Sequence, residues 1–332
     1  MLQQTRVETV VAYYHRFLKR FPTLADLARA REEEVLALWS GLGYYRRARS
    51  LLAGARQVVS QFGGEFPKTL EDALSLPGVG NYTAAAVLSI AYGLPHPVVD
   101  GNVERVITRY LRLPGNPKRT VVARKLREVA CGWLPADASG DFNQALMELG
   151  ATICTPGRPK CAECPLNSAC KARQHGDADR FPRLPAPRPT EHLELEVGIL
   201  ESRGRYLMER PVDFGFLEGL WVFPLADTTK RTAPRGPGIA ARLAERLGVD
   251  VQATAELVPL RHAITFRRIA LRPIRLKTSK IDIRGRQEFR WARAGDFGRT
   301  VPVSSICLKI ASRIDRDRSL CNEELGENGR FS

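Results

Sequence analysis

Four of the seven cysteines in this chain fall in one short stretch, with the spacing C-x6-C-x2-C-x5-C. They are Cys154, Cys161, Cys164 and Cys170, and the other cysteines are scattered along the sequence. Thiolates this close can converge on one centre, either a zinc ion or a 4Fe–4S cluster. Structural zinc sites usually use two short-spaced pairs, whereas this stretch has a single short pair, so the spacing favours the iron–sulfur cluster. A disulfide scaffold fits poorly, because such chains are shorter and more evenly supplied with cysteine.

The rest of the chain divides into two parts of different character. Residues 1–173 are predicted to be mostly helical, with the cysteine loop at 154–170, and residues 174–191 form a proline-rich linker. Residues 192–313 are predicted to be a smaller α+β domain, and residues 314–332 a disordered tail. Apolar periodicity predicts helices at Glu32–Trp39, Arg46–Gln61, Thr83–Ala91, Val103–Leu111 and Ile239–Leu247. Strand-like patterns occur at Leu193–Leu200, Arg205–Glu209, Ile269–Leu276 and Gln287–Trp291.

The charge balance points to a polyanionic partner. The 332 residues include 51 Lys and Arg against 36 Asp and Glu, a formal net charge of +15. A surplus of this size attracts nucleic acid, although a protein can also be basic without binding it. There is no apolar run of about 18 residues, so we expect no membrane partner. The start of the chain lacks the apolar core of a secretory signal, which predicts a cytoplasmic protein.

A glycine-rich turn and an aspartate follow one another in the helical part. The turn comprises Pro77, Gly78, Val79 and Gly80 and lies just before a predicted helix. Backbone N–H groups of such a turn, at a helix N-terminus, can bind a phosphate. Asp100 stands twenty residues beyond Gly80, at the start of the next helix. Two interpretations of Asp100 are possible. It could serve only as the N-cap of the helix, or it could be an ionised carboxylate at the mouth of a cleft, where it would face a positive charge that develops during a reaction.

These motifs together closely resemble the MutY-type adenine DNA glycosylases, which are iron–sulfur members of the helix-hairpin-helix DNA glycosylase superfamily. The resemblance covers residues 1–173 with high specificity and continues more loosely through 192–313, where the sequence looks like a Nudix-like domain without a pyrophosphatase box. The matching segments are Met1–Thr5, Gly41–Arg46, Leu76–Thr83, Val99–Val103, Phe142–Ala145 and the cysteine loop.

The resemblance implies a monofunctional glycosylase that hydrolyses the N-glycosidic bond of adenine mispaired with 8-oxoguanine or guanine in double-stranded DNA. Asp100 would stabilise the oxocarbenium-like sugar, Asn102 would orient Asp100, and Tyr82 would lie near the reacting sugar. The resemblance further implies a 4Fe–4S cofactor on the four cysteines, a monomer, and a place in the bacterial cytosol or nucleoid. The residues expected to contact DNA or the two bases are Gln3, Gln4, Thr5, Leu42, Tyr44, Pro77, Gly78, Val79, Gly80, Gln144 and Thr265.

The sequence departs from the family pattern in two places. The general-acid Glu of the family precedes the Met1–Thr5 motif by two residues, so this sequence as given is expected to be impaired in catalysis. The family's Phe-Ser-His loop is matched by Ile264, Thr265 and Phe266, which keeps a hydroxyl but replaces the His, so discrimination of 8-oxoguanine is expected to be weaker or differently built.

Two other functions remain open. The first is a glycosylase with lyase activity like endonuclease III. In those relatives a Lys occupies the position of Tyr82, and a phenol cannot form the imine that strand cleavage requires. The second is a module that binds the lesion pair without catalysis.

Overall fold

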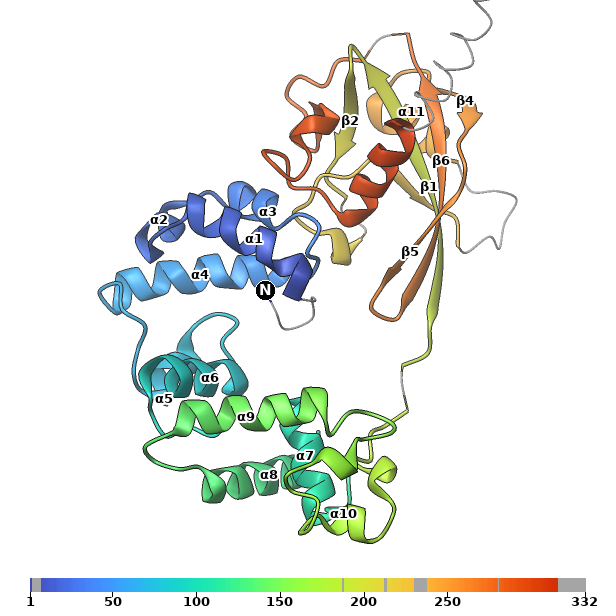
Figure 1. Cartoon of the computed structure of the whole chain (residues 1–332). Helices are drawn as coiled ribbons and strands as arrows, with labels where there is room; N and C mark the ends of the chain where they lie inside the picture. The colour runs from blue at the N-terminus through green and yellow to red at the C-terminus, as the bar shows by residue number, and fades with distance from the viewer. Residues whose placement is uncertain (2–6, 187, 212–213, 230–237, 280, 316–332) are drawn as a thin grey trace, which may run out of the picture. The chain divides into compact units, whose positions relative to one another are not determined.

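The computed structural model describes residues 1, 7–186, 188–211, 214–229, 238–279 and 281–315 (Figure 1). The chain forms two compact units. One unit combines Met1–Arg56 with Arg188–Ser332, and the other is Gln57–Pro187. The sequence predicted a boundary at the proline-rich linker alone. The first 56 residues instead group with the part that follows the linker, and each unit is described by itself below.

The unit Gln57–Pro187 is helical, as predicted. Two glycines allow close packing of its helices: a Cβ at Gly140 would lie 2.7 Å from the Ser89 carbonyl oxygen, and one at Gly150 would lie 2.6 Å from the Asn102 Cβ. Val103, Ile107 and other apolar side chains of the helices around them form a buried core. Its helices are α5 (Leu70–Ser75), α6 (Asn81–Tyr92), α7 (Gly101–Leu111), α8 (Thr120–Trp133), α9 (Ser139–Thr152) and α10 (Lys171–Gln174).

The other unit is α+β, which confirms the predicted class of the second half. Its seven-stranded sheet has the order β4-β6-β1-β2-β7, with β3 paired to β1 and β5 paired to β6. Strands β1 and β6 pair in parallel, a long-range pairing that the sequence did not predict. The strands are β1 (Glu191–Ser202), β2 (Arg205–Glu209), β3 (Leu225–Asp227), β4 (Gln252–Glu256), β5 (Leu260–Ile264), β6 (Arg267–Lys277) and β7 (Phe289–Ala292). Helix α11 (Ile239–Leu247) packs on the sheet and ends at Gly248 in the left-handed conformation.

The N-terminal helices share a hydrophobic core with this sheet. Phe17 and Trp39 belong to the same buried cluster as Leu195 and Ile310. Polar contacts add to the packing, because Glu33 accepts hydrogen bonds from the Trp221 indole at 2.9 Å and from Arg290 at 2.8 Å. The shared core explains why residues 1–56 group with the sheet. These helices are α1 (Val7–Arg20), α2 (Leu24–Arg29), α3 (Glu32–Trp39) and α4 (Tyr45–Gln61).

The end of the described chain is also part of this core. Residues 305–315 are helical, and the side chains of Ile306, Ile310 and Ile314 are buried. The predicted tail began at residue 314, but Ile314 is fully buried in the helix, and the remaining residues of that tail lie outside the described part. No helix among the described residues is long and apolar enough to span a membrane.

Candidate functional site

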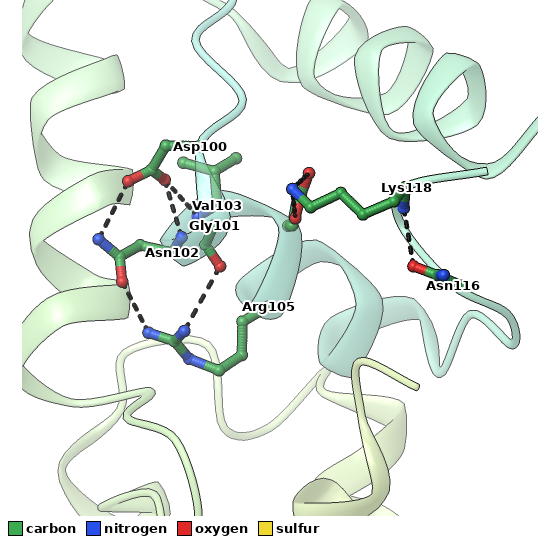
Figure 2. Close-up of polar contacts among 8 residues, drawn as sticks. Asp100, Gly101, Asn102, Val103, Arg105, Asn116 and Lys118 are labelled. Atoms are coloured by element: carbon green, nitrogen blue, oxygen red, sulfur yellow. Dashed lines mark hydrogen bonds and ion pairs between the residues drawn. The ribbon is translucent and has the colours of Figure 1, made fainter. Parts of the chain in front are cut away.

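Asp100 is the N-cap of α7 and is held by three hydrogen bonds (Figure 2). Its Oδ1 accepts from the backbone N–H groups of Asn102 at 2.9 Å and Val103 at 2.8 Å. Its Oδ2 accepts from the Asn102 side-chain amide at 3.0 Å. The donors and the helix N-terminus both stabilise negative charge on the half-buried carboxylate and fix its orientation. Asp100 is thus the N-cap of α7, and the Asn102 amide donates to the carboxylate that it is predicted to orient. The catalytic role of Asp100 stays a prediction.

Arg105, which the sequence analysis did not single out, continues this network. Its Nη2 donates to the Asn102 Oδ1 at 2.8 Å and to the Gly150 carbonyl at 2.6 Å (Figure 2 shows the bond to Asn102). Its Nε donates to the Cys154 carbonyl at 2.6 Å. Burial, reinforced by the charge of a neighbouring arginine, lowers the pKa of Arg105, while Asp100 and Cys154 oppose that shift. A continuous polar chain thus runs from Asp100 to the first cysteine of the loop. The only feature of the sequence that could have indicated this role of Arg105 is its position three residues after Asn102 on the same predicted helix.

Tyr82 lies within electrostatic reach of Asp100. Burial first, and then the negative charge of Asp100, raise the pKa of Tyr82 above its usual value. The phenol is therefore a neutral group that is partly exposed at the start of α6. The predicted place of Tyr82 near the reacting sugar stays a prediction.

The turn before α6 leaves the first N–H groups of the helix without a side-chain cap. Gly78 has a φ of 77°, which favours glycine, and the Val79 N–H closes the turn onto the Leu76 carbonyl at 3.1 Å. Gly80 is the N-cap of α6 and offers no side chain to the first N–H groups of the helix. Those donors are free of a side-chain cap and can bind a phosphate.

Gln144 lies exposed on α9, where its side-chain amide donates to the Gly140 carbonyl of its own helix at 3.3 Å. The exposed position agrees with the predicted contact to a flipped base but does not test it. Pro77 belongs to the turn before α6 and is exposed.

The four clustered cysteines line a single cavity of about 30 Å³ together with Arg109. Arg109 donates from Nη1 to the Cys154 Sγ at 3.4 Å, and the Cys170 thiol lies 3.6 Å from the Arg109 carbonyl. Burial, with smaller contributions from the other three cysteines, raises the pKa of Cys164. In the part of the chain that the structure describes, none of the four forms a disulfide. Within the described residues no three His, Cys, Asp or Glu side chains are arranged to hold a single metal ion. Four thiols around one cavity, with the Arg109 guanidinium beside them, are a donor set whose sulfur atoms can bind iron or zinc.

A second cavity, of about 440 Å³, brings together three predicted DNA contacts in the unit that contains the sheet. Leu42, Tyr44 and Thr265 all line it, and His262 and Ser305 lie beside them. Tyr44 and Thr265 have φ angles of 51° and 53°, in the left-handed region that non-glycine residues rarely adopt.

His262 also lines this cavity, although it was not among the residues predicted to contact DNA. Its Nε2 lies 3.2 Å from the Ser305 Oγ, and its Nδ1 is buried without a hydrogen-bond partner. Burial lowers the pKa of His262 to about 4, so the ring is neutral at physiological pH. Gln3, Gln4 and Thr5, also predicted to contact DNA, lie outside the described residues.

Comparison with known proteins identifies the class and then the family. Residues 1–131 match the HhH-GPD superfamily of base excision DNA repair proteins. The adenine DNA glycosylase of Homo sapiens is 40% identical over 271 residues, which cover 68% of this chain and 50% of the human protein. The adenine DNA glycosylase of Buchnera aphidicola subsp. Schizaphis graminum is 32% identical over 232 residues, covering 70% of this chain and 67% of the relative. The chain belongs to the adenine DNA glycosylase family, and it spans about half the length of its human and mouse relatives.

Two solved structures show partial similarity to this chain. A thermostable thymine-DNA glycosylase is 32% identical with a TM-score of 0.48, covering 52% of this chain and 80% of that one. The MutT protein from Methanosarcina mazei Go1 is 14% identical with a TM-score of 0.31, covering 39% of this chain and 96% of that one.

Proposed function

We propose that this chain is a monofunctional adenine DNA glycosylase that acts on adenine paired with 8-oxoguanine or guanine in double-stranded DNA. The observation that carries the proposal is the Asp100 carboxylate, which three N–H donors hold at the N-terminus of α7. Cleavage of the bond between adenine and the sugar leaves positive charge on the sugar ring, which a fixed carboxylate stabilises until water adds. In the family that the sequence resembles, a Glu preceding the Met1–Thr5 motif protonates the leaving adenine.

The proposed role of Asp100 is tested by single-turnover release of adenine from an adenine:8-oxoguanine duplex. The parent chain, however slow, is compared with Asp100→Asn, which keeps the size of the side chain and removes its charge. We expect the rate constant to fall by about 100-fold or more, because the charge on the sugar loses its counter-charge. Unchanged release by Asp100→Asn would contradict the proposal.

The neutral phenol of Tyr82 supports hydrolysis without strand cleavage. A lyase needs an amine that attacks the sugar and forms an imine, and a phenol cannot form one. Borohydride therefore should not trap a covalent complex between this chain and its DNA. A trapped complex would instead favour the bifunctional reaction of endonuclease III.

The cavity that Leu42, Tyr44 and Thr265 line is the proposed site for the base opposite adenine. The hydroxyl of Thr265 would supply a polar contact at the position of the family's Ser. The proposal predicts that Thr265→Ala reduces the preference for 8-oxoguanine over guanine, measured as the ratio of the two dissociation constants. An unchanged ratio would place recognition elsewhere.

We propose that Cys154, Cys161, Cys164 and Cys170 hold a 4Fe–4S cluster. A bound cluster would cross-link the loop between these cysteines and so fix its shape. Basic side chains within and beside that loop, at Arg158, Lys160, Lys171 and Arg173, would then face DNA phosphates, so binding should weaken steeply with salt. We further propose that the protein acts as a monomer in the bacterial cytosol or nucleoid.

A further inference from the structure

The segment that leads to Asp100 has no regular secondary structure. Residues 93–99 lie between α6 and α7 and include two prolines, which have no backbone N–H groups. Val98 is completely buried, so its backbone N–H needs a partner inside the protein. The position of Asp100 therefore depends on the groups that form hydrogen bonds with the backbone of residues 93–99.

Asn143 of α9 supplies those partners. Its side chain is almost completely buried, with 1% exposed. The Val98 N–H donates to the Asn143 Oδ1 at 3.0 Å, and the Asn143 Nδ2 donates to the His96 carbonyl at 2.9 Å. The second hydrogen of Nδ2 reaches the Ser89 Oγ on α6, also at 2.9 Å. One amide thus joins α9, α6 and the segment before Asp100, with both of its N–H donors used.

Helix α9 also holds the chain on the other side of Asp100. Arg105, five residues after Asp100, donates to the Gly150 carbonyl of α9 at 2.6 Å. The backbone that carries Asp100 is therefore fastened to one helix both before and after the carboxylate. The close approaches at Gly140 and Gly150 leave this helix no room to shift towards α6 or α7.

We propose that Asn143 is a positioning residue, which sets the Asp100 carboxylate relative to Gln144, the next residue of α9 and the predicted contact to the flipped adenine. This inference rests on the proposed adenine excision. It assigns to Asn143 a function beyond packing, because the bonds at His96 and Val98 decide where the following carboxylate lies.

The test measures the position of the carboxylate without requiring turnover. Two duplexes carry, opposite 8-oxoguanine, either a cationic pyrrolidine abasic-site analogue or the neutral tetrahydrofuran analogue. A well-placed Asp100 should favour the cation by at least about 10-fold in dissociation constant, because the cation mimics the charged sugar. Asn143→Leu, of similar volume, should reduce that preference to within about 3-fold of unity and leave the affinity for the neutral analogue within about 3-fold of the parent.

Ser89→Ala is the matched control. It removes one contact of the same amide but keeps both bonds to the segment 96–98, so the preference for the cation should persist. If Asn143→Leu does not fold, Asn143→Ser serves in its place, with hydrogen exchange of residues 94–99 as a second measurement. Faster exchange there, together with a lost preference for the cation, is the expected result.

The outcomes separate this inference from the function on which it rests. No preference for the cation in the parent chain, or a preference that survives Asp100→Asn, would refute the proposed role of Asp100. A parent preference that Asn143→Leu retains in full would refute the positioning role alone. Equal loss of affinity for both analogues would show that Asn143 only stabilises the fold, and would also refute it.

Discussion

Arg105 offers the most direct test of how the loop of cysteines supports the site. Its guanidinium donates to the Asn102 side chain and to the carbonyls of Gly150 and Cys154, at 2.6 to 2.8 Å. In Arg105→Leu these three acceptors lose a charged donor. Hydrogen bonds to charged groups contribute roughly 1.5–3 kcal/mol each when buried, and this side chain is only part-buried, so we expect a total loss of about 3 kcal/mol in the free energy of unfolding.

The same substitution should also slow catalysis. Without Arg105 the Asn102 amide is free to turn, and Asp100 then loses the bond to its Oδ2, which is worth about 1 kcal/mol. A loss of that size in the transition state corresponds to roughly a 5-fold lower rate constant. Arg105→Lys should recover only part of either loss, because a single ammonium cannot reproduce the planar fork of donors.

The assay combines urea unfolding with single-turnover release of adenine at saturating enzyme, under conditions in which every variant is folded. Arg112→Leu is the control, since Arg112 ends the same helix and pairs with Asp177, away from the chain of bonds to Asp100. We expect that control to keep the parent rate constant. An Arg105→Leu variant that excised adenine within 2-fold of the parent would show that Asn102 holds Asp100 without help, and the reasoning would fail.

Three further predictions test other parts of the structure. Cys161→Ser should lower the iron and sulfide content of the purified chain, measured colorimetrically, whereas Cys131→Ser, at an exposed thiol outside the loop, should not. Because burial lowers the pKa of His262 to about 4, only the unfolded chain binds this proton between about pH 6.5 and 4. Stability should therefore fall as the pH is lowered through that range, by roughly 1 kcal/mol at pH 5 after allowance for partial exposure, and His262→Gln should reduce the fall seen in urea unfolding. Gly150→Ala places a Cβ 2.6 Å from Asn102 and should cost about 1–3 kcal/mol and slow excision, whereas Gly132→Ala, with open space around it, should do neither.

The local features of the fold were predictable from sequence. Helix Glu32–Trp39 and strand Arg205–Glu209 were predicted with the bounds that the structure gives, because apolar spacing and glycine or proline breaks act within a few residues. The parallel pairing of β1 with β6 was not, since it joins residues far apart in the chain. Strand β4 was missed as well, because all five of its side chains are exposed and leave no alternating pattern.

The candidate site divides in the same way. Asp100 and Asn102 were recognisable because they lie in one short motif at a helix start. Arg105 and Asn143 were not assigned functions, because each makes hydrogen bonds to residues more than forty positions away, in addition to the local bond of Arg105 to Asn102. From the sequence alone, a polar residue in a helix that is buried and hydrogen-bonded to other segments cannot be distinguished from one that is exposed to solvent.

The left-handed backbone at Tyr44 and Thr265 has a consequence for how a ligand would enter the cavity between them. Each residue holds a conformation that costs roughly 1 kcal/mol or more, which the surrounding packing must compensate. Both side chains are therefore presented by backbone that surrounding packing already fixes. The rate at which a ligand associates with this cavity should therefore depend on diffusion and charge, and not on a slow rearrangement of the two turns. Glycine at either position would relieve the backbone strain but would leave the backbone less fixed.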